Sequence, residues 1–373
     1  MRRALRILAV GAAALLSPRP LAAQAPPADP EPGHPAVEFH GLVSVSYSYG
    51  FNAPPSRANQ LRVFDYDDDA FRLDEVELVV QRPAPAPGDV GFRVDFTAGA
   101  VSRVIASRGL FRDSAGEGQD MDVHQAFVSF VAPVGSGLRL DAGKFVTGLG
   151  YEVIEGYDGW NDNATHSFLF GYAIPFTHTG VRAAYALAPA VTSMLMVANG
   201  WDNVEDNNRG KTTALQIAWT PSRRLTLVLN GITGPEQTGD DVHDRDVLDA
   251  DATWRPSDRV SLGLNGDWGR ETGAAQGGRM AVWRGVAGYA RITPGTRTAL
   301  SLRIERFEDR DGARTGTAQT LSEITLTPEA KLGPSGILRG DLRLDVSDRA
   351  VFESRSGPRQ TQPTVSVNAL YHF

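Results

Sequence analysis

The sequence contains no cysteine among its 373 residues. Disulfide bonds are therefore excluded, so an exported protein of this sequence would be held together by other means. Thiolate metal sites and cysteine nucleophiles are excluded for the same reason. The seven histidines show none of the spacings of a zinc site or a nucleophile elbow. We predict no catalytic residue, no metal site and no cofactor.

The sequence also lacks a long apolar run. A helix needs about 20 apolar residues to span a bilayer, and no segment of this chain comes near that length. Hydrophobic residues nevertheless make up 42% of the chain. They mostly alternate with polar residues, which is typical of strands that meet a different environment on each face.

The N-terminus predicts export. Arginines at positions 2, 3 and 6 precede the short apolar run 7–16, and Ala23-Gln24-Ala25 is a small-x-small cleavage site. This combination is typical of a secretory signal peptide, here residues 1–25. We interpret residues 26–38, which are rich in proline, as a flexible leader. Residues 39–373 then form a single domain.

Cleavage would make the chain strongly acidic. Residues 1–25 contain four arginines and no acidic residue, so their removal moves the formal charge from −7 to −11. Nucleic-acid binding depends on basic surfaces. We therefore expect no nucleic-acid partner.

Alternating segments recur from Phe39 to the C-terminus and predict about sixteen strands. Most have about ten residues, the length that a tilted strand needs to cross a bilayer. A change of phase near Asp74 and Glu75 predicts a β-bulge. The predicted strands are residues 39–50, 71–82, 89–98, 122–132, 137–146, 177–187, 190–199, 211–220, 223–231, 245–255, 259–269, 281–293, 297–307, 319–328, 336–346 and 362–373.

The connections alternate strictly between long and short. Seven are short and contain proline: Pro83 to Pro87, Pro133, Pro189, Pro221, Pro256, Pro294 and the Pro328 to Pro334 stretch. Eight are long: 51–70, 99–121, 147–176, 200–210, 232–244, 270–280, 308–318 and 347–361. An even strand number with short periplasmic turns and long extracellular loops is typical of outer-membrane β-barrels. A soluble sandwich has no reason to separate its loops in this way.

The strand near residue 340 favours a barrel with a water-filled lumen. Leu338, Leu342 and Leu344 alternate with charged residues, which would be costly to bury in the core of a sandwich. The last strand also alternates and ends on Tyr371-His372-Phe373. It resembles the C-terminal strand of bacterial outer-membrane barrels, whose terminal Phe is read by the barrel-assembly machinery. We therefore assign Tyr371 and Phe373 to an assembly signal.

Four segments resemble the β-barrel porin-2 family, OmpL-like outer-membrane porins within the wider porin superfamily. They are Asp141 to Phe145, Gly150 to Glu155, Phe168 to Arg182 and Asn199 to Val204. The resemblance implies a channel for passive diffusion of small hydrophilic solutes or ions in the outer membrane of a Gram-negative-type bacterium. It also implies contact with lipid and lipopolysaccharide, and suggests a homotrimer.

In sixteen-stranded porins the third long loop narrows the lumen, so the resemblance places loop 147–176 at the constriction. A ring of carboxylates favours cations. The alternative is that the charges pair on the wall and only stiffen it. The predicted constriction residues are Glu152, Glu155, Asp158 and Asp162 on the loop, and Arg93, Arg139, Arg182, Arg339 and Arg343 on the wall.

Two other classes of function stay open at this point. A barrel without a channel could act as an adhesin or a structural anchor. A hydrolase at the barrel rim is the third alternative, and we predict that the protein is not an enzyme. Conductance across a planar bilayer separates a channel from the first alternative, and hydrolysis assays separate it from the second.

Overall fold

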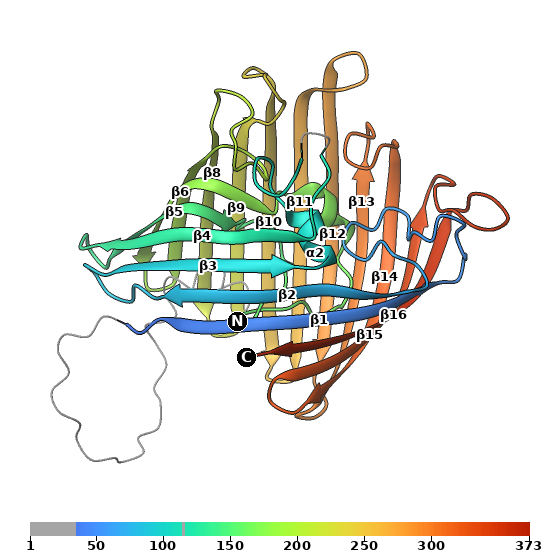
Figure 1. Cartoon of the computed structure of the whole chain (residues 1–373), viewed down its shortest axis with the longest axis horizontal. Helices are drawn as coiled ribbons and strands as arrows, with labels where there is room; N and C mark the ends of the chain where they lie inside the picture. Colours follow the sequence, from blue (N-terminus) through green and yellow to red (C-terminus); the bar gives the residue numbers. More distant parts are fainter. Residues whose placement is uncertain (1–34, 114–115) are drawn as a thin grey trace.

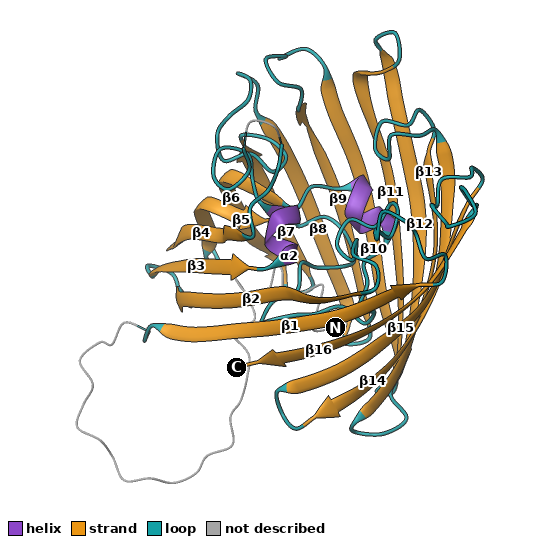
Figure 2. Ribbon diagram, turned by 45° about the vertical axis from the view of Figure 1, so that its right-hand side comes forward, coloured by secondary structure: helices purple, strands orange, loops and turns teal. Residues whose placement is uncertain are grey.

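The structure, a computed structural model, describes residues 35–113 and 116–373. In this part of the chain, antiparallel strands form one closed barrel in which every strand pairs with its sequence neighbours and β16 pairs with β1 (Figures 1 and 2). The predicted all-β fold and the predicted strand number are confirmed. The predicted signal peptide, 1–25, and the leader up to residue 34 lie outside the described residues.

The strands begin and end close to the predicted positions. They are β1 (Glu38–Gly50), β2 (Ala70–Arg82), β3 (Val90–Ala98), β4 (Met121–Ala132), β5 (Leu138–Val146), β6 (Thr177–Ala188), β7 (Val191–Ala198), β8 (Thr212–Ser222), β9 (Leu225–Pro235), β10 (Asp244–Ser257), β11 (Val260–Ala275), β12 (Arg279–Ile292), β13 (Thr298–Asp309), β14 (Gln319–Leu332), β15 (Gly336–Ser347) and β16 (Thr361–His372). Two short helices, α2 (Ala100–Ile105) and the π-helix η2 (Leu169–Ala173), lie in the second and third loops. No helix among the described residues is long and apolar enough to cross a membrane.

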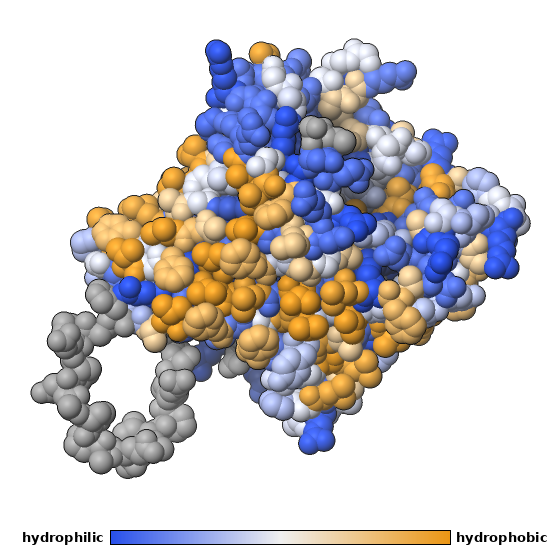
Figure 3. Space-filling view, in the orientation of Figure 1, coloured by the Kyte–Doolittle hydropathy of each residue, from blue (hydrophilic) through white to orange (hydrophobic). Residues whose placement is uncertain are grey.

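The two faces of the barrel wall differ as the alternation predicts. Large apolar side chains are exposed on the outer face, and they form a continuous apolar surface over the first strands (Figure 3). On β15, Leu342 is 56% exposed, whereas Arg343 beside it is 3% exposed. The inward orientation of the charges is confirmed. Their predicted water-filled surroundings are wrong on this wall, because the third loop packs against these side chains and buries them.

The barrel closes through the two ends of the chain. Val43 of β1 lies opposite Tyr371 of β16, and the backbones of Gly41 and Phe373 exchange two hydrogen bonds of 3.0 and 3.1 Å. A Cβ atom on Gly41 would lie 2.6 Å from the Glu77 carbonyl oxygen and 2.6 Å from the Phe373 ring. Only glycine therefore allows this close approach.

Seven of the eight long connections are confirmed as loops, and one prediction is wrong. The long loops are L1 (51–69), L2 (99–120), L3 (147–176), L4 (199–211), L5 (236–243), L7 (310–318) and L8 (348–360). The connection predicted at 270–280 is the tight turn 276–278, because β11 and β12 stay paired out to Ala275 and Arg279. This hairpin projects beyond the neighbouring strands at the top of Figure 1.

Three of the prolines predicted in short turns lie inside strands instead. Pro221 and Pro256 lie near the ends of β8 and β10, where the register shifts, and Pro328 lies in β14. Proline cannot donate to the strand ladder, and a register shift leaves a position where no such donor is needed. The turns themselves, 223–224 and 258–259, contain no proline.

Two bulges lie on adjacent regions of the wall. On β2, Ser44 opposes Glu75 and Val45 opposes Leu73, so Asp74 is the extra residue and the predicted bulge is confirmed. On β4, a second bulge at His124 was not predicted: Asp95 opposes Gln125 and Phe96 opposes Val123. Each bulge turns two consecutive residues toward the lumen.

Candidate lumen constriction

Loop L3 folds into the barrel and is held there by backbone hydrogen bonds to the far wall. The Glu305 carboxylate of β13 accepts hydrogen bonds from the amides of Phe168 and Leu169, at 2.8 and 2.5 Å. The Asp341 carboxylate of β15 accepts one from the Thr165 amide at 2.7 Å. The loop is therefore fixed across the lumen from its own strands, β5 and β6.

Every predicted acidic residue of L3 forms an ion pair with an arginine of the wall. The arginines come from β3, β12, β13 and β15, so the four pairs attach L3 to separated parts of the barrel. The pairs are Glu152 with Arg303 (2.8 Å), Glu155 with Arg339 (2.9 Å), Asp158 with Arg93 (2.8 Å) and Asp162 with Arg291 (3.4 Å). The charges of loop and wall are thus in contact and do not face each other across a gap.

The Glu155 and Arg339 pair is buried and has the most hydrogen bonds between its two side chains. Both terminal nitrogens of the guanidinium donate to the carboxylate at 2.9 Å, and one also donates to the Asn161 carbonyl oxygen at 2.8 Å. Burial by itself would raise the pKa of Glu155, but the charge and hydrogen bonds of Arg339 together with the hydrogen bond from the Asn161 amide outweigh this effect and lower the pKa below its ordinary value.

The remaining predicted arginines divide into two groups. Arg343 donates to the His166 carbonyl oxygen of L3 at 2.5 Å and pairs with Asp345 at 2.7 Å. Arg139 and Arg182 both pair with Asp141 on the wall, at 3.0 and 2.9 Å, rather than with the loop. Sequence reasoning missed Arg291, which lies on the poorly alternating strand β12.

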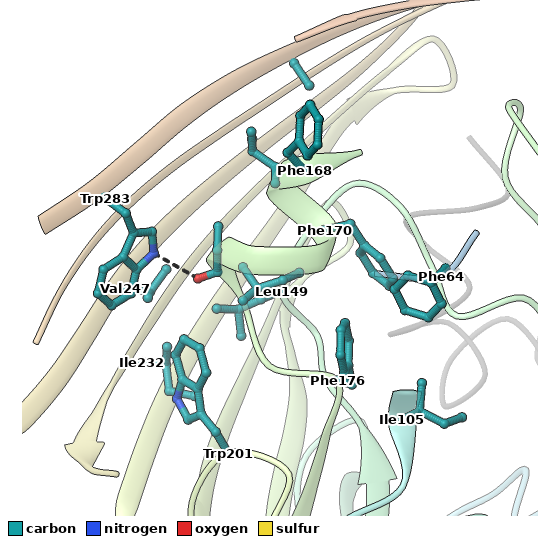
Figure 4. Close-up of a cluster of buried hydrophobic side chains, with 14 of the residues drawn as sticks. Phe64, Ile105, Leu149, Phe168, Phe170, Phe176, Trp201, Ile232, Val247 and Trp283 are labelled. Carbon is teal, nitrogen blue, oxygen red and sulfur yellow. Dashed lines mark hydrogen bonds between the residues drawn. The ribbon is translucent and has the colours of Figure 1, made fainter. Parts of the chain in front are cut away.

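The poor alternation of β7 and β12 has a structural cause. Their inward residues are apolar because they pack against L3: Met194 and Met196 on β7, and Trp283 on β12, are at most 6% exposed. The Trp283 indole donates to the Ala173 carbonyl oxygen of η2 at 3.2 Å (Figure 4). A lumen lined only by polar residues would have kept the alternation.

An apolar cluster inside the barrel joins the loops to one another. Phe64 of L1, Ile105 of L2 and Trp201 of L4 pack in the same cluster as Phe168, Phe170 and Phe176 of L3 (Figure 4). The Phe64 and His166 rings stack at 4.2 Å. Burying such aromatic side chains stabilises a fold by about 1.5–3 kcal/mol each, so this cluster and the ion pairs together hold L3 in place.

A cavity of about 240 Å³ remains between L3 and the wall, and several charged residues line it. Glu77 and Arg93 lie on one wall, Arg291 on another, and Asp158 and Asp162 on the loop. This cavity brings the loop acids and the wall arginines together in a lining that also contains apolar side chains such as Phe127 and Leu149.

Carboxylates outnumber cations on the inner wall. All five predicted wall arginines, together with Arg291 and Arg303, are in ion pairs. Among the described residues, eight buried carboxylates of the wall strands have no ion-pair partner. These are Glu75, Glu77, Asp249, Asp251, Asp267, Glu305, Asp309 and Asp341.

A buried carboxyl group at the loop end of the barrel makes stability depend on pH. Glu236 of L5 accepts hydrogen bonds from the Trp201 amide at 2.8 Å and the Thr212 hydroxyl at 2.5 Å. Burial raises the pKa of Glu236 to about 7, above its ordinary value of 4.5. Between these values the folded state binds more protons than the unfolded state, so the free energy of unfolding falls as pH rises.

We expect the Glu236→Gln variant to lose this dependence. The wild type should lose up to about 3 kcal/mol of unfolding free energy between pH 4.5 and 7 from this group. Denaturant unfolding of the detergent-purified barrel at pH 5 and pH 8 measures the difference. Glu205→Gln, at an exposed position of L4, is the matched control and should behave as the wild type. Equal pH dependence in all three proteins would contradict the assignment.

The closed sixteen-stranded barrel and the inward-folded third loop define the porin class of outer-membrane channels. The family described as "Putative beta-barrel porin-2, OmpL-like" matches residues 36–373, and the chain belongs to this family. The predicted resemblance is confirmed. Family and fold support an outer-membrane channel, and do not favour an adhesin, an anchor or a rim hydrolase.

Solved porin structures share the fold at low sequence identity. OmpF of Salmonella typhi, in a complex with daunomycin, has a TM-score of 0.63 at 10% identity, covering 90% of this chain and 97% of that chain. The outer membrane channel DcaP of Acinetobacter baumannii has a TM-score of 0.61 at 11% identity, with the same coverage of the two chains. An anion-selective porin from Comamonas acidovorans has a TM-score of 0.59 at 12% identity, covering 91% of this chain and 99% of that chain. A comparison with curated proteins found no match.

Proposed function

We propose that this porin lets small hydrophilic solutes diffuse passively and prefers cations, with L3 forming the narrowest part of the path. One observation carries the proposal: the seven wall arginines named above are in ion pairs, while eight buried wall carboxylates among the described residues have no such partner. An excess of negative charge in a pore attracts cations and repels anions.

The four ion pairs of L3 then have two different tasks. Glu152 and Glu155 are at most 9% exposed and are matched by buried arginines, so they hold the loop against the wall. All four acidic residues line the cavity, but Asp158 and Asp162 are more exposed, with 32% and 18% of their side chains accessible, and they lie beside Arg93 and Arg291. We infer that this second group acts on passing ions.

Two substitutions of opposite sign test the proposal. Asp158→Asn leaves Arg93 with less compensation and should shift the reversal potential toward anions. Arg291→Gln removes the positive charge beside Asp162 and Glu329 and should shift the reversal potential toward cations. One unit charge about 7 Å from an ion in water-like surroundings contributes about 0.6 kcal/mol, so each permeability ratio should change by a factor of about 2–3. Planar-bilayer recordings in a KCl gradient measure the shift.

The matched controls change charge outside the lumen. Glu117→Gln in L2 and Arg284→Gln on the outer face of β12 alter the net charge by the same amounts at exposed positions. They should leave the reversal potential unchanged. The cation preference would be refuted by an anion-selective wild type, and the role of the cavity by equal shifts in cavity and control variants.

The expected partners follow from the porin family and the barrel fold. We infer that the barrel contacts lipid and lipopolysaccharide, is inserted by the barrel-assembly machinery after signal-peptide cleavage, and catalyses no reaction. A homotrimer is the assembly we expect from the porin fold. Chemical crosslinking of intact outer membranes tests the trimer, and a heat-dependent gel mobility shift reports the folded barrel.

A further inference from the structure

Three side chains from neighbouring strands converge on the lumen wall beside the cavity: Glu77 of β2, Asp95 of β3 and His124 of β4. One possible ligand atom of each lies within 4.8 Å of those of the other two. All three residues are at most 3% exposed, and Glu77 and His124 line the cavity. We propose that these three residues bind a divalent transition-metal ion of the Zn²⁺ type.

His124 is the residue that points most directly to a ligand. Neither of its ring nitrogens has a hydrogen-bond partner among the described residues, although it is only 3% exposed. Buried polar groups are normally paired, because an unpaired one is costly. The equally buried His178 follows this rule: its nitrogens contact the Gly200 carbonyl oxygen at 3.0 Å and the Thr147 hydroxyl at 3.2 Å. His124 is thus free to coordinate an ion.

The bulge on β4 produces this arrangement. Asp122 and Gln125 are three residues apart, and a regular strand would place them on opposite faces of the wall. Both nevertheless face the lumen. The bulge at His124 accommodates the change of phase and leaves His124 and Gln125 both facing the lumen. Bulges occur often next to functional sites, because they redirect a side chain at the expense of regular pairing.

The local charge favours a divalent cation. Arg93 is shared between Asp95, at 2.9 Å, and Asp158, at 2.8 Å, so one cation compensates two carboxylates. Glu77 has no ion-pair partner among the described residues, and the neighbouring Glu75 of β2 is also buried without one. Lys144, the other nearby cation, is neutralised by Asp122 at 2.7 Å.

The donors present suit a transition metal. One imidazole and two carboxylates are three protein ligands of the kind that hold Zn²⁺ while leaving a fourth position open, here toward the cavity. Ca²⁺ needs six to eight oxygen ligands, which this site does not offer. The carboxylates are already oriented: Glu77 accepts from the Tyr157 amide at 2.7 Å, and Asp95 from the Gln125 amide group at 2.6 Å. Such outer contacts are typical of metal sites.

Isothermal titration of the full-length, detergent-purified barrel with Zn²⁺ tests the proposal. The wild type should bind one ion per barrel at this site. His124→Gln should weaken binding by at least the 10- to 100-fold that the loss of an outer-shell contact costs. Glu77→Gln keeps the acceptor for the Tyr157 amide but removes the charge, and should also weaken binding. Absorption of bound Co²⁺ in the visible range provides a second readout of the ligands.

His243→Gln, at a partly exposed position of L5, and His178→Gln are the matched controls and should bind as the wild type. The heat-dependent mobility shift verifies that each variant is folded. A wild type that binds no Zn²⁺, or one whose affinity and Co²⁺ spectrum do not change in folded His124→Gln and Glu77→Gln barrels, would overturn the proposal. The binding measurement does not depend on ion flow, so its failure leaves the proposed cation preference standing.

Discussion

The free energy of unfolding of an Arg339→Met variant should be about 3–5 kcal/mol lower than that of the wild type. The variant should also conduct more current per channel. The substitution leaves the Glu155 carboxylate buried without its counter-ion, and breaking a buried pair in this way carries a cost of that size. It also removes the hydrogen bond to the Asn161 carbonyl oxygen, so L3 loses one of its attachments to β15. Denaturant unfolding and single-channel recordings measure the two effects.

The matched control removes an arginine from an exposed pair. Arg284 pairs with Glu308 at 2.8 Å on the outer face, with the Arg284 side chain 64% exposed. Arg284→Met should lose no more than about 1 kcal/mol, because exposed ion pairs contribute little. The double variant Arg339→Met with Glu155→Met should regain much of the lost stability, since no unpaired charge remains. An Arg339→Met barrel as stable as the wild type would show that this pair does not anchor L3.

Deletion of Phe373 should reduce the amount of folded barrel in the outer membrane at least tenfold. Phe373 provides both backbone hydrogen bonds to Gly41 at the seam between β1 and β16. Without them, a backbone amide and a carbonyl group of the seam lose their partners next to lipid, where each unpaired group costs several kcal/mol. The heat-dependent mobility shift in isolated outer membranes measures the folded fraction.

Phe373→Ala separates the two roles of this residue. It keeps the backbone hydrogen bonds but removes the ring, which is 57% exposed on the outer face. A defect equal to that of the deletion indicates that the ring is read during assembly, whereas normal folding indicates that seam closure alone matters. Phe71→Ala removes another exposed outer aromatic, 89% exposed, and should assemble normally. Normal assembly of the deletion variant would refute both roles.

The alternation of apolar and polar residues was sufficient to predict the barrel fold, because this alternation can be recognised within each strand alone. A strand with lipid on one face must present an apolar residue at every second position, so the alternation of β15 or β16 can be recognised without knowing the neighbouring strands. The prediction of a strand's faces from alternation failed where the inner face is also apolar, as on β12. There Trp283 packs against η2, and the period-2 signal disappears.

The candidate site was predicted only as a set of residues. The four acidic residues of L3 and most of the wall arginines were recognised by charge and position. Their pairing could not be predicted, because Glu155 and Arg339 lie 184 positions apart and meet only where the folded loop crosses the lumen. The prediction that the β15 charges lie in water was wrong for the same reason.

The sequence by itself therefore determined the class of fold, the number of strands, which face of most strands meets lipid, and which loop enters the barrel. These properties follow from period, length and resemblance along single segments. Only the tertiary structure decided how the lumen is filled, which carboxylates are left without an arginine, and that the bulge on β4 places His124 beside Glu77 and Asp95. Each of these depends on side chains from distant segments meeting inside one closed barrel, and no local pattern encodes such a meeting.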